Sequence, residues 1–390
     1  MNVGIITSTF TPNLNGISVS LQKLVEQLQQ RKVNTWIATP KIHKYKYLPY
    51  VFPMRVIPFT HLFQRVLQDI QVPFLYRVEM EKFFKTKNID VIHSHDTGIL
   101  FKEAGRLAQL FKVPHVHTYH TLMEEYLKIL HPFGYRWYAR ILTRRACNHA
   151  DIVIAPTDKI KKYLHKIGVK TEVIALLNVP NIDHLSKISK DSDLMKKLGI
   201  SKDDFVFISF GRVVKQKSID TSIDYLTPLL KKHKSIKFLI MGFGPEIDNL
   251  KKHAREKGVG DKVIFSGEYS RYELVNYANL ADCFVITSKS ETQGVTLLEA
   301  MACGLPVVAI DDTAYDYILK DQYNGLKGND YNFTEILETI YLNRDLRLRM
   351  SDNALFSAQE LSKRNFTLEY IDLYNRAIEK YKQKFTVNIK

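Results

Sequence analysis

Two glutamates, Glu291 and Glu299, stand eight positions apart in a segment that follows a short apolar run and turns helical in pattern near Val295. Backbone amides at the start of a helix suit a diphosphate, so Gly294, Val295 and Thr296 are candidate phosphate-binding residues. Glu291 precedes the helix and Glu299 lies within it, so the two carboxylates are placed to meet different groups of hydroxyls. Two acids at this spacing are also compatible with ordinary surface charge.

Two basic residues, Arg212 and Lys217, follow another apolar run, Phe205–Phe210. A basic pair after a strand could bind an anionic group such as a phosphate. In a chain with a net charge of +15, the same residues could also form a solvated surface. The sequence therefore predicts chemistry on a phosphorylated ligand and leaves the surface interpretation open.

The Glu-x7-Glu segment and the Ala-Met-Ala-Cys-Gly-Leu-Pro-Val-Val that follows resemble the donor-binding signature of the retaining GT-B glycosyltransferases. That family contains glycogen synthases, sucrose synthases, phosphatidylinositol mannosyltransferases and diacylglycerol glucosyltransferases. The resemblance to the diacylglycerol glucosyltransferases is greatest, because Gln293 stands where the commoner form of the motif has Phe. Further landmarks of the family follow its order along the chain, at residues 11–17, 117–121, 210–218 and 242–245.

The resemblance implies a role for each matching residue in binding a UDP-hexose. Arg212, Lys217 and the helix start near Val295 would hold the diphosphate. Glu299 would bind the ribose, and Glu291 with His120 would contact the sugar. Gly16 would let the backbone approach the phosphates. The resemblance further implies retention of configuration, with the departing phosphate accepting the proton of the acceptor, and no requirement for a metal or other cofactor.

The elements that must position these residues are short apolar runs alternating with helical patterns, which is typical of parallel sheets with crossover helices. We expect an α/β protein of GT-B architecture, with two Rossmann-like doubly wound domains that face each other across a cleft. The predicted domains are residues 1–180 and 200–365, and a helix at 366–390 packs back on the first. Predicted strands are Val3–Thr7, Asn34–Ala38, Val91–His93, His115–Thr118, Ile152–Ala155, Phe205–Phe210, Lys237–Met241, Lys262–Phe265, Cys283–Thr287 and Pro306–Ala309.

Positive charge is concentrated in the first half of the chain. Residues 1–178 contain 25 basic and 12 acidic residues, which gives a net charge of +13. Residues 179–390 contain 31 basic and 29 acidic residues, which gives a net charge of only +2. Two stretches, Lys41–Arg77 and His131–Arg145, combine this charge with aromatic residues, which is typical of an interfacial helix on anionic lipid. A partly buried helix with a solvated basic face is the alternative. We expect no nucleic-acid partner, because no helix-turn-helix, zinc-finger or RNA-binding signature is present.

The N-terminus lacks a signal-peptide pattern, and no apolar run approaches the roughly 18–20 residues of a membrane span. The sequence thus predicts a cytoplasmic protein at the inner face of the membrane that glycosylates a lipid, with diacylglycerol as the expected acceptor. Two alternatives remain. One is transfer to a soluble glycan, wall polymer or protein, which vesicle dependence would distinguish. The other is a non-catalytic protein that binds sugar nucleotides, which would be expected to lack some of these polar residues.

Overall fold

The computed structural model describes residues 1–10, 16–41, 46–54, 56–57, 72–73, 77–124, 135–364 and 366–387. The chain divides into two compact units. The first unit comprises Met1–Pro180 together with Asn365–Lys390, and the second comprises Asn181–Arg364.

The first unit is built on a parallel sheet that has, within the described residues, seven strands in the order β3-β2-β1-β6-β7-β8-β9. The strand order reverses between β1 and β6, the point at which an open α/β sheet forms a ligand crevice at its carboxyl edge. A separate antiparallel pair joins β4 (Val56–Ile57) to β5 (Val72–Pro73). The strands of the main sheet are β1 (Asn2–Ile6), β2 (Asn34–Pro40), β3 (Val51–Met54), β6 (Val91–Ser94), β7 (His115–Thr118), β8 (Ile152–Ala155) and β9 (Glu172–Ala175).

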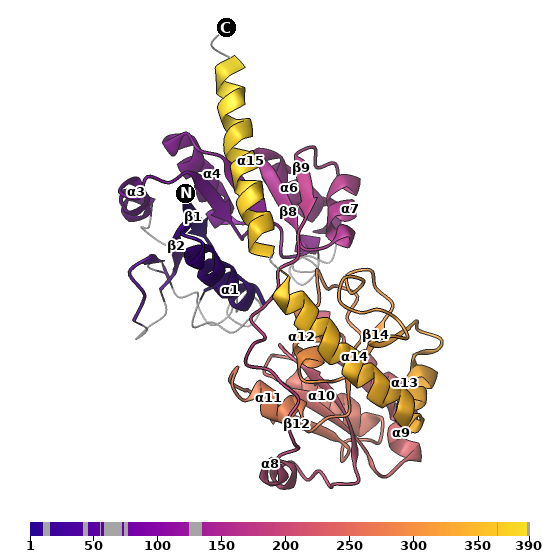
Figure 1. Ribbon diagram of the computed structural model, residues 1–390. Helices are drawn as coiled ribbons and strands as arrows, with labels where there is room; N and C mark the ends of the chain where they lie inside the picture. Colours follow the sequence, from indigo (N-terminus) through magenta and orange to yellow (C-terminus); the bar gives the residue numbers. More distant parts are fainter. Residues whose placement is uncertain are drawn as a thin grey trace. The chain divides into compact units, whose positions relative to one another are not determined.

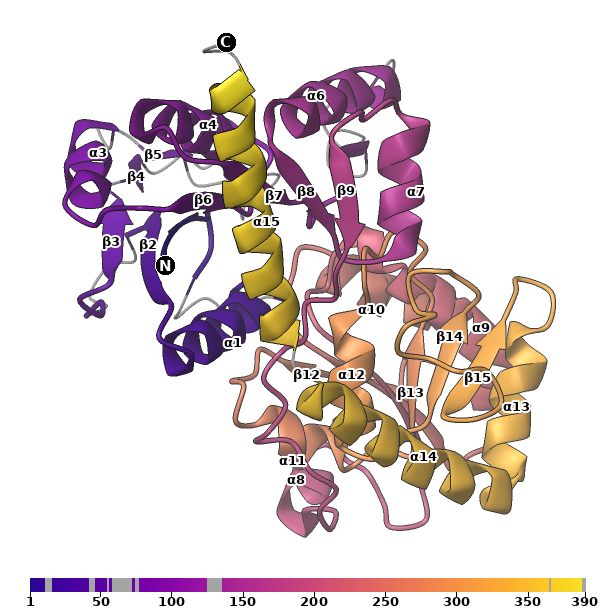
Figure 2. The same cartoon turned by 45° about the horizontal axis from the view of Figure 1, so that its top comes forward.

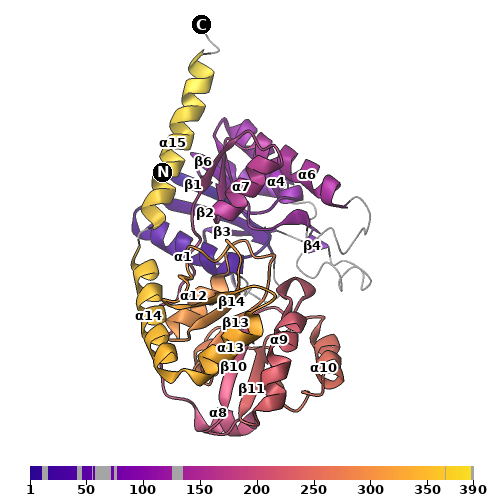
Figure 3. The ribbon, with the colours of Figure 1, turned by 90° about the vertical axis from the view of Figure 1, so that its right-hand side faces the viewer.

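Helices cover both faces of this sheet, as Figure 3 shows, with α1 and α15 on one side and α4 and α6 on the other. Residues on both faces of the central strands β6, β7 and β8 are buried, as expected for a parallel sheet covered by helices on both sides. β8 is entirely apolar, whereas β6 and β7 also bury histidine, serine and threonine side chains. The helices of this unit are α1 (Gly16–Gln30), α3 (Arg77–Lys85), α4 (Ile99–Phe111), α6 (Tyr135–His149), α7 (Asp158–Lys166) and α15 (Phe366–Val387).

The second unit repeats the architecture with a parallel sheet in the order β12-β11-β10-β13-β14-β15. Its strand order reverses between β10 and β13. Helices α9 and α10 cover one face, and α12 and α14 cover the other (Figure 3). The strands are β10 (Phe205–Phe210), β11 (Ile236–Met241), β12 (Val263–Gly267), β13 (Cys283–Ile286), β14 (Val307–Ile310) and β15 (Gly325–Gly328). The helices are α8 (Ser192–Lys197), η1 (Lys215–Lys217), α9 (Ile219–Lys232), α10 (Ile247–Glu256), α11 (Leu274–Ala278), α12 (Val295–Ala302), α13 (Phe333–Leu342) and α14 (Arg344–Lys363).

Helix α15 follows the second unit in sequence but belongs to the first (Figures 1 and 2). Its buried face consists of Tyr370, Leu373, Tyr374 and Ala377, which recur at the three- and four-residue spacing of an amphipathic helix. The Tyr370 hydroxyl donates to Oδ1 of Asn178 at 2.5 Å, which ties the helix to the segment after β9. The helix is therefore an integral part of the first unit.

The predicted fold class is confirmed, since both units are doubly wound parallel sheets of Rossmann type. The predicted strands coincide with observed ones or differ at their ends by one or two residues. The three cysteines, Cys147, Cys283 and Cys303, are buried and free. The cleft that we expect between the two domains stays a prediction.

Candidate active site

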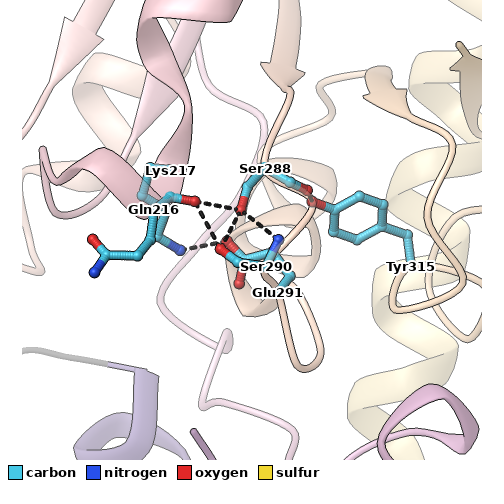
Figure 4. A network of polar contacts seen from close by, with 6 residues as sticks. All are labelled: Gln216, Lys217, Ser288, Ser290, Glu291 and Tyr315. Carbon is cyan, nitrogen blue, oxygen red and sulfur yellow. Dashed lines mark hydrogen bonds and ion pairs between the residues drawn. The ribbon is translucent and has the colours of Figure 1, made fainter. Parts of the chain in front are cut away.

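Two loops meet at the point of strand reversal in the second unit, one after β10 and one after β13. Ser288 and Ser290 in the second loop both donate from Oγ to the backbone oxygen of Gln216 in the first, at 2.9 and 2.8 Å (Figure 4). Thr287 Oγ1 donates in the same way to the backbone oxygen of Ser218, at 2.6 Å. These hydroxyls join the two loops, so the side chains that the loops carry are held in fixed relation.

Lys217 and Glu291 form an ion pair across the joined loops, with 2.5 Å between Nζ and Oε1 (Figure 4). The two side chains are only 28% and 13% exposed, so solvent screens this pair less than a typical surface pair. Arg212 is the second cation, and burial lowers the pKa of its guanidinium while the charge of Glu291 opposes that shift. The loops thus place two cations around one carboxylate.

The second loop, which follows β13, packs against Tyr315, and this side chain helps to fix the conformation of the loop. The Tyr315 hydroxyl donates to the backbone oxygen of Ser288 at 2.6 Å (Figure 4). The ring lies beside Gly294, where an added Cβ would come within 2.8 Å of two ring carbons. Gly294 also has φ of +77°, a conformation that glycine adopts without strain, and it is the residue from which α12 begins. Both constraints select glycine, and the amides of Val295 and Thr296 follow in the first turn of α12.

Glycine shapes the first loop as well. Gly242, after β11, has φ of +146°, and an added Cβ would lie 1.8 Å from the backbone oxygen of Gly211. The strand-end backbones of β10 and β11 therefore approach each other closely only because this position lacks a side chain. That approach fixes the backbone next to Arg212.

Glu299 projects from α12 and is the fourth acidic or basic group described at this edge, after Arg212, Lys217 and Glu291. Burial raises the pKa of its carboxyl to about 7, although the positive charges of Arg271 and Lys217 act to lower it. Burial also raises the pKa of the Tyr269 hydroxyl, and the charge of Glu299 adds to that effect. Glu299 therefore sits in an environment that disfavours its own charge unless a hydrogen-bond donor is provided.

In the first unit the predicted residues Gly16 and His120 lie near the carboxyl edge of the sheet. Gly16 is the first residue of α1, and the loop at residues 11–15 that precedes it lies outside the described residues. His120 follows β7, and its Nε2 lies 2.8 Å from Nδ1 of His95. The structure thus describes His120 with a partner that the sequence did not single out.

A carboxylate that the sequence analysis missed also lies at the strand reversal of the first unit. Asp96, just after β6, accepts hydrogen bonds from Ser8, just after β1: one from the backbone N–H at 2.5 Å and one from the hydroxyl. Burial raises the pKa of Asp96 to about 6, although the bonds from Ser8 act to lower it. The signal that could have found Asp96 was the run of polar residues, His93 to Asp96, at the end of an apolar strand.

Helix α6 carries the basic and aromatic residues that were predicted to meet a membrane. Only Ala139, Thr143 and Cys147 are buried, one side of the helix facing the unit's core. Trp137 and Tyr138 are 70% and 52% exposed. The exposed arginines of the helix are Arg136, Arg140, Arg144 and Arg145.

Most of the other predicted stretch, residues 41–77, lies outside the described residues. Two of its described aromatic residues are engaged within the unit. Phe52 stacks on Phe83 with ring centroids 5.4 Å apart, and the Tyr47 hydroxyl donates to the backbone oxygen of Pro40 at 3.2 Å. These two rings are therefore structural, and α6 is the better described candidate for contact with a membrane.

Two Rossmann-like units, one with cations and carboxylates at its strand reversal, have the architecture of the GT-B class of glycosyltransferases. Sequence models of two families agree: "Glycosyl transferases group 1" matches residues 190–355 and "Glycosyltransferase Family 4" matches residues 14–178. The chain belongs to the group 1 glycosyltransferases with the GT-B fold. The predicted family and the prediction of a glycosyltransferase are confirmed.

Curated relatives match the chain over nearly its whole length. An alpha-monoglucosyldiacylglycerol synthase of Acholeplasma laidlawii is 27% identical over 98% of this chain and 99% of its own. An enzyme of the same name from Streptococcus pneumoniae is 26% identical over 97% of this chain and 86% of its own.

Solved structures agree on the fold. The sucrose-phosphate synthase of Thermosynechococcus elongatus has a TM-score of 0.78 at 17% identity, covering 97% of this chain and 99% of its own. HepE from Anabaena, solved with UDP and glucose, has a TM-score of 0.74 at 16% identity, covering 96% of this chain and 100% of its own.

Proposed function

We propose that this glycosyltransferase moves glucose from UDP-glucose to diacylglycerol, with retention of the α configuration, at a membrane surface. The observation that carries the proposal is the near-full-length similarity to two alpha-monoglucosyldiacylglycerol synthases. Because that similarity spans both units, it includes the half that would bind the acceptor as well as the half that would bind the donor.

In this proposal the strand reversal of the second unit binds the sugar nucleotide. Arg212, Lys217 and the amides at the start of α12 hold the diphosphate, and Glu299 accepts hydrogen bonds from the ribose hydroxyls. The burial of Glu299 supports this role, because two hydroxyl donors would compensate the cost of its charge. Glu291 contacts the sugar, and its ion pair with Lys217 holds the carboxylate and the ammonium group in a fixed relative position.

The first unit contributes His120, which contacts the sugar, and Gly16, which allows the backbone to approach the phosphates. The reaction breaks the bond between the anomeric carbon and the diphosphate oxygen, and forms one between that carbon and the lipid hydroxyl oxygen. The hydroxyl proton passes to the departing phosphate. Negative charge grows on that phosphate in the transition state, and Arg212 and Lys217 stabilise it, so the reaction proceeds without a divalent metal.

The exposed face of α6 is the surface that we assign to the membrane. Trp137 and Tyr138 supply rings suited to the interface, and the surrounding arginines supply charge attracted to anionic headgroups. Each basic residue near such a surface contributes about 1 kcal/mol at low screening. Arg140 also pairs with Glu124 at 2.7 Å, so its contribution is smaller. Among the described helices, we find none whose length and hydropathy would allow a membrane crossing.

The reaction is tested by incubating the protein with UDP-glucose, UDP-galactose or GDP-mannose over mixed-lipid vesicles that contain diacylglycerol. Mass spectrometry should detect a monohexosyl diacylglycerol from UDP-glucose, and NMR of the product should show an α linkage. If the protein instead transfers sugar to a water-soluble acceptor without needing vesicles, then diacylglycerol is not its acceptor. Nucleotide binding without any transfer or donor hydrolysis would indicate a non-catalytic protein.

Membrane docking is tested by sedimentation with neutral and anionic vesicles over a range of salt concentrations. Binding should require anionic lipid and weaken with salt, since a Debye length of about 10 Å at 0.1 M screens these charges. A variant with glutamine at the four arginines of α6 should lose most binding and keep turnover on a short-chain acceptor. The matched control replaces the four lysines of α7 and should bind as the wild type does; these are Lys159, Lys161, Lys162 and Lys166. Equal loss in both variants would show that only overall charge matters.

A further inference from the structure

Histidines crowd the centre of the first sheet, at β6, β7 and the residues that follow them. Side chains alternate between the faces of a strand, and the contacts sort these rings into two groups. On the face covered by α4, Ser94 Oγ lies 2.8 Å from Nε2 of His115 and 2.9 Å from Nδ1 of His117, and Phe101 of α4 packs against both rings. The face covered by α15 carries His93, His95 and His120.

On the α15 face, His95 is held between two other histidines. Its Nδ1 lies 2.8 Å from Nε2 of His120, and the two rings are nearly parallel, with an interplanar angle of 20°. The His93 ring lies on it with centroids 4.1 Å apart. His93 is itself fixed by the Tyr374 hydroxyl of α15, 2.8 Å from Nδ1, and by Thr118 Oγ1, 2.7 Å from Nε2. A continuous set of contacts thus runs from α15 to His120.

Burial determines the protonation state of His95 and His120. Burial lowers the pKa of His120 to about 3, and it lowers the pKa of His95 well below its usual value with help from neighbouring histidines. Both rings are therefore neutral at physiological pH, and each has one N–H and one bare nitrogen. A single proton lies between His95 Nδ1 and His120 Nε2. Nε2 of His95 is buried and has no hydrogen-bond partner among the described residues, so a proton there would be an unpaired buried donor. The His95 proton therefore belongs on Nδ1, His120 accepts at Nε2, and the proton of His120 is on Nδ1, the nitrogen that can serve a ligand.

We propose that His95 is a positioning residue that holds the His120 ring in one orientation and one tautomer, with Nδ1 presented to the hexose of the sugar nucleotide. This inference rests on the proposed function, in which His120 contacts the sugar. A neutral ring suits that task, because a sugar hydroxyl exchanges a hydrogen bond with an uncharged nitrogen without the cost of burying a charge. The contacts of His93 and Tyr374 hold His95 in turn.

The test compares three variants by steady-state kinetics with UDP-glucose and by titration with UDP, which has no hexose. His95→Leu removes the hydrogen bond and keeps an apolar side chain. His95→Asn restores a polar group where Nδ1 stood, because both groups are separated from Cα by the same number of bonds. His117→Leu alters an equally buried histidine on the opposite face and serves as the control.

We expect His95→Leu to lower kcat about 10- to 100-fold, the cost of misplacing one contact at a reacting sugar. Its affinity for UDP should stay within about twofold of wild type, because His120 does not contact the nucleotide. His95→Asn should recover most of the loss, and His117→Leu should lower thermal stability with kcat unchanged. Wild-type turnover in His95→Leu would overturn the proposal. So would an equal loss of UDP affinity, or a failure of asparagine to do better than leucine.

A second measurement keeps this inference separate from the proposed function. Nitrogen NMR of histidine-labelled protein reports the tautomer of His120 without any substrate. One tautomer in the wild type and in His95→Asn, with a mixture in His95→Leu, would support positioning by His95 even if no sugar were transferred. A wild type that transfers sugar but shows a mixed His120 tautomer would overturn the inference and leave the proposed function standing.

Discussion

Replacing Glu299 by glutamine should make the protein more stable and its nucleotide binding weaker. The pKa of Glu299 is about 7 in the folded state, whereas an ordinary glutamate, as in the unfolded chain, has a pKa of 4.5. Because the pKa is raised on folding, the free energy of unfolding falls as pH rises between these values, and the penalty is complete above pH 7. At 1.36 kcal/mol per pKa unit the penalty is roughly 3 kcal/mol. Residual exposure of the side chain reduces this to about 1–3 kcal/mol.

The same substitution removes a charged acceptor from the ribose. A hydrogen bond to a charged group contributes about 1.5–3 kcal/mol, so Kd for UDP-glucose should rise about ten- to a hundredfold in Glu299→Gln at pH 8. In the wild type, affinity should increase with pH up to about 7 and then level off, because only the ionised carboxylate is a charged acceptor. The variant should show no such rise.

Calorimetric titration with UDP-glucose between pH 5.5 and 8.5, together with thermal unfolding at each pH, measures both effects. The exposed Glu335 of α13 provides a control, since Glu335→Gln should change neither quantity. An increase in stability together with a decrease in affinity for UDP-glucose would distinguish a ligand-binding carboxylate from a structural one. A Glu299→Gln variant that is less stable than the wild type, or that binds UDP-glucose equally well, would refute the reasoning.

Further predictions concern the joined loops of the second unit. Lys217→Ala and Arg212→Ala should each lower kcat by about a hundredfold or more with folding intact, since charge on the leaving diphosphate grows in the transition state; circular dichroism checks the folding. Glu291→Ala should lower kcat more than it lowers UDP affinity, which stopped assays and titration compare. Gly294→Ala should weaken UDP binding because of its positive φ and the Tyr315 ring, whereas Gly199→Ala, with a similar φ and open space, should cost only modest stability. EDTA should leave turnover unchanged, and a loss that a divalent ion restores would show that the basic pair is not the main neutralising device.

The strands of the two main sheets that the sequence analysis missed share one physical cause. β3, β9 and β15 each lie at an edge of their sheet, where one side has no neighbour and fewer apolar residues are required. β3 contains Pro53, and β15 reads Gly-Leu-Lys-Gly, so neither has the apolar content of a central strand. Central strands such as β8 and β10 were predictable because burial on both faces favours a nearly unbroken apolar run.

The pairs that make the site required knowledge of strand order. Lys217 and Glu291 could each be singled out from local sequence, but they are 74 residues apart, and only the adjacency of β10 and β13 brings them together. The bond between His93 and Tyr374 spans 281 residues, and nothing in the amphipathic pattern of α15 indicates which surface it covers. His95 was overlooked because its importance comes from its contact with His120 rather than from a motif.

The return of α15 to the first unit has a consequence for the order in which the protein matures. Domains generally fold as units during synthesis, and the N-terminal one usually folds first. Here the second unit is one continuous stretch and holds every strand of its own sheet, so its folding does not require α15. His93 acquires its tyrosine partner only when α15 has emerged from the ribosome. The unit that is begun first is thus completed last, and a chain truncated after α14 would have a complete second unit and a first unit that lacks α15.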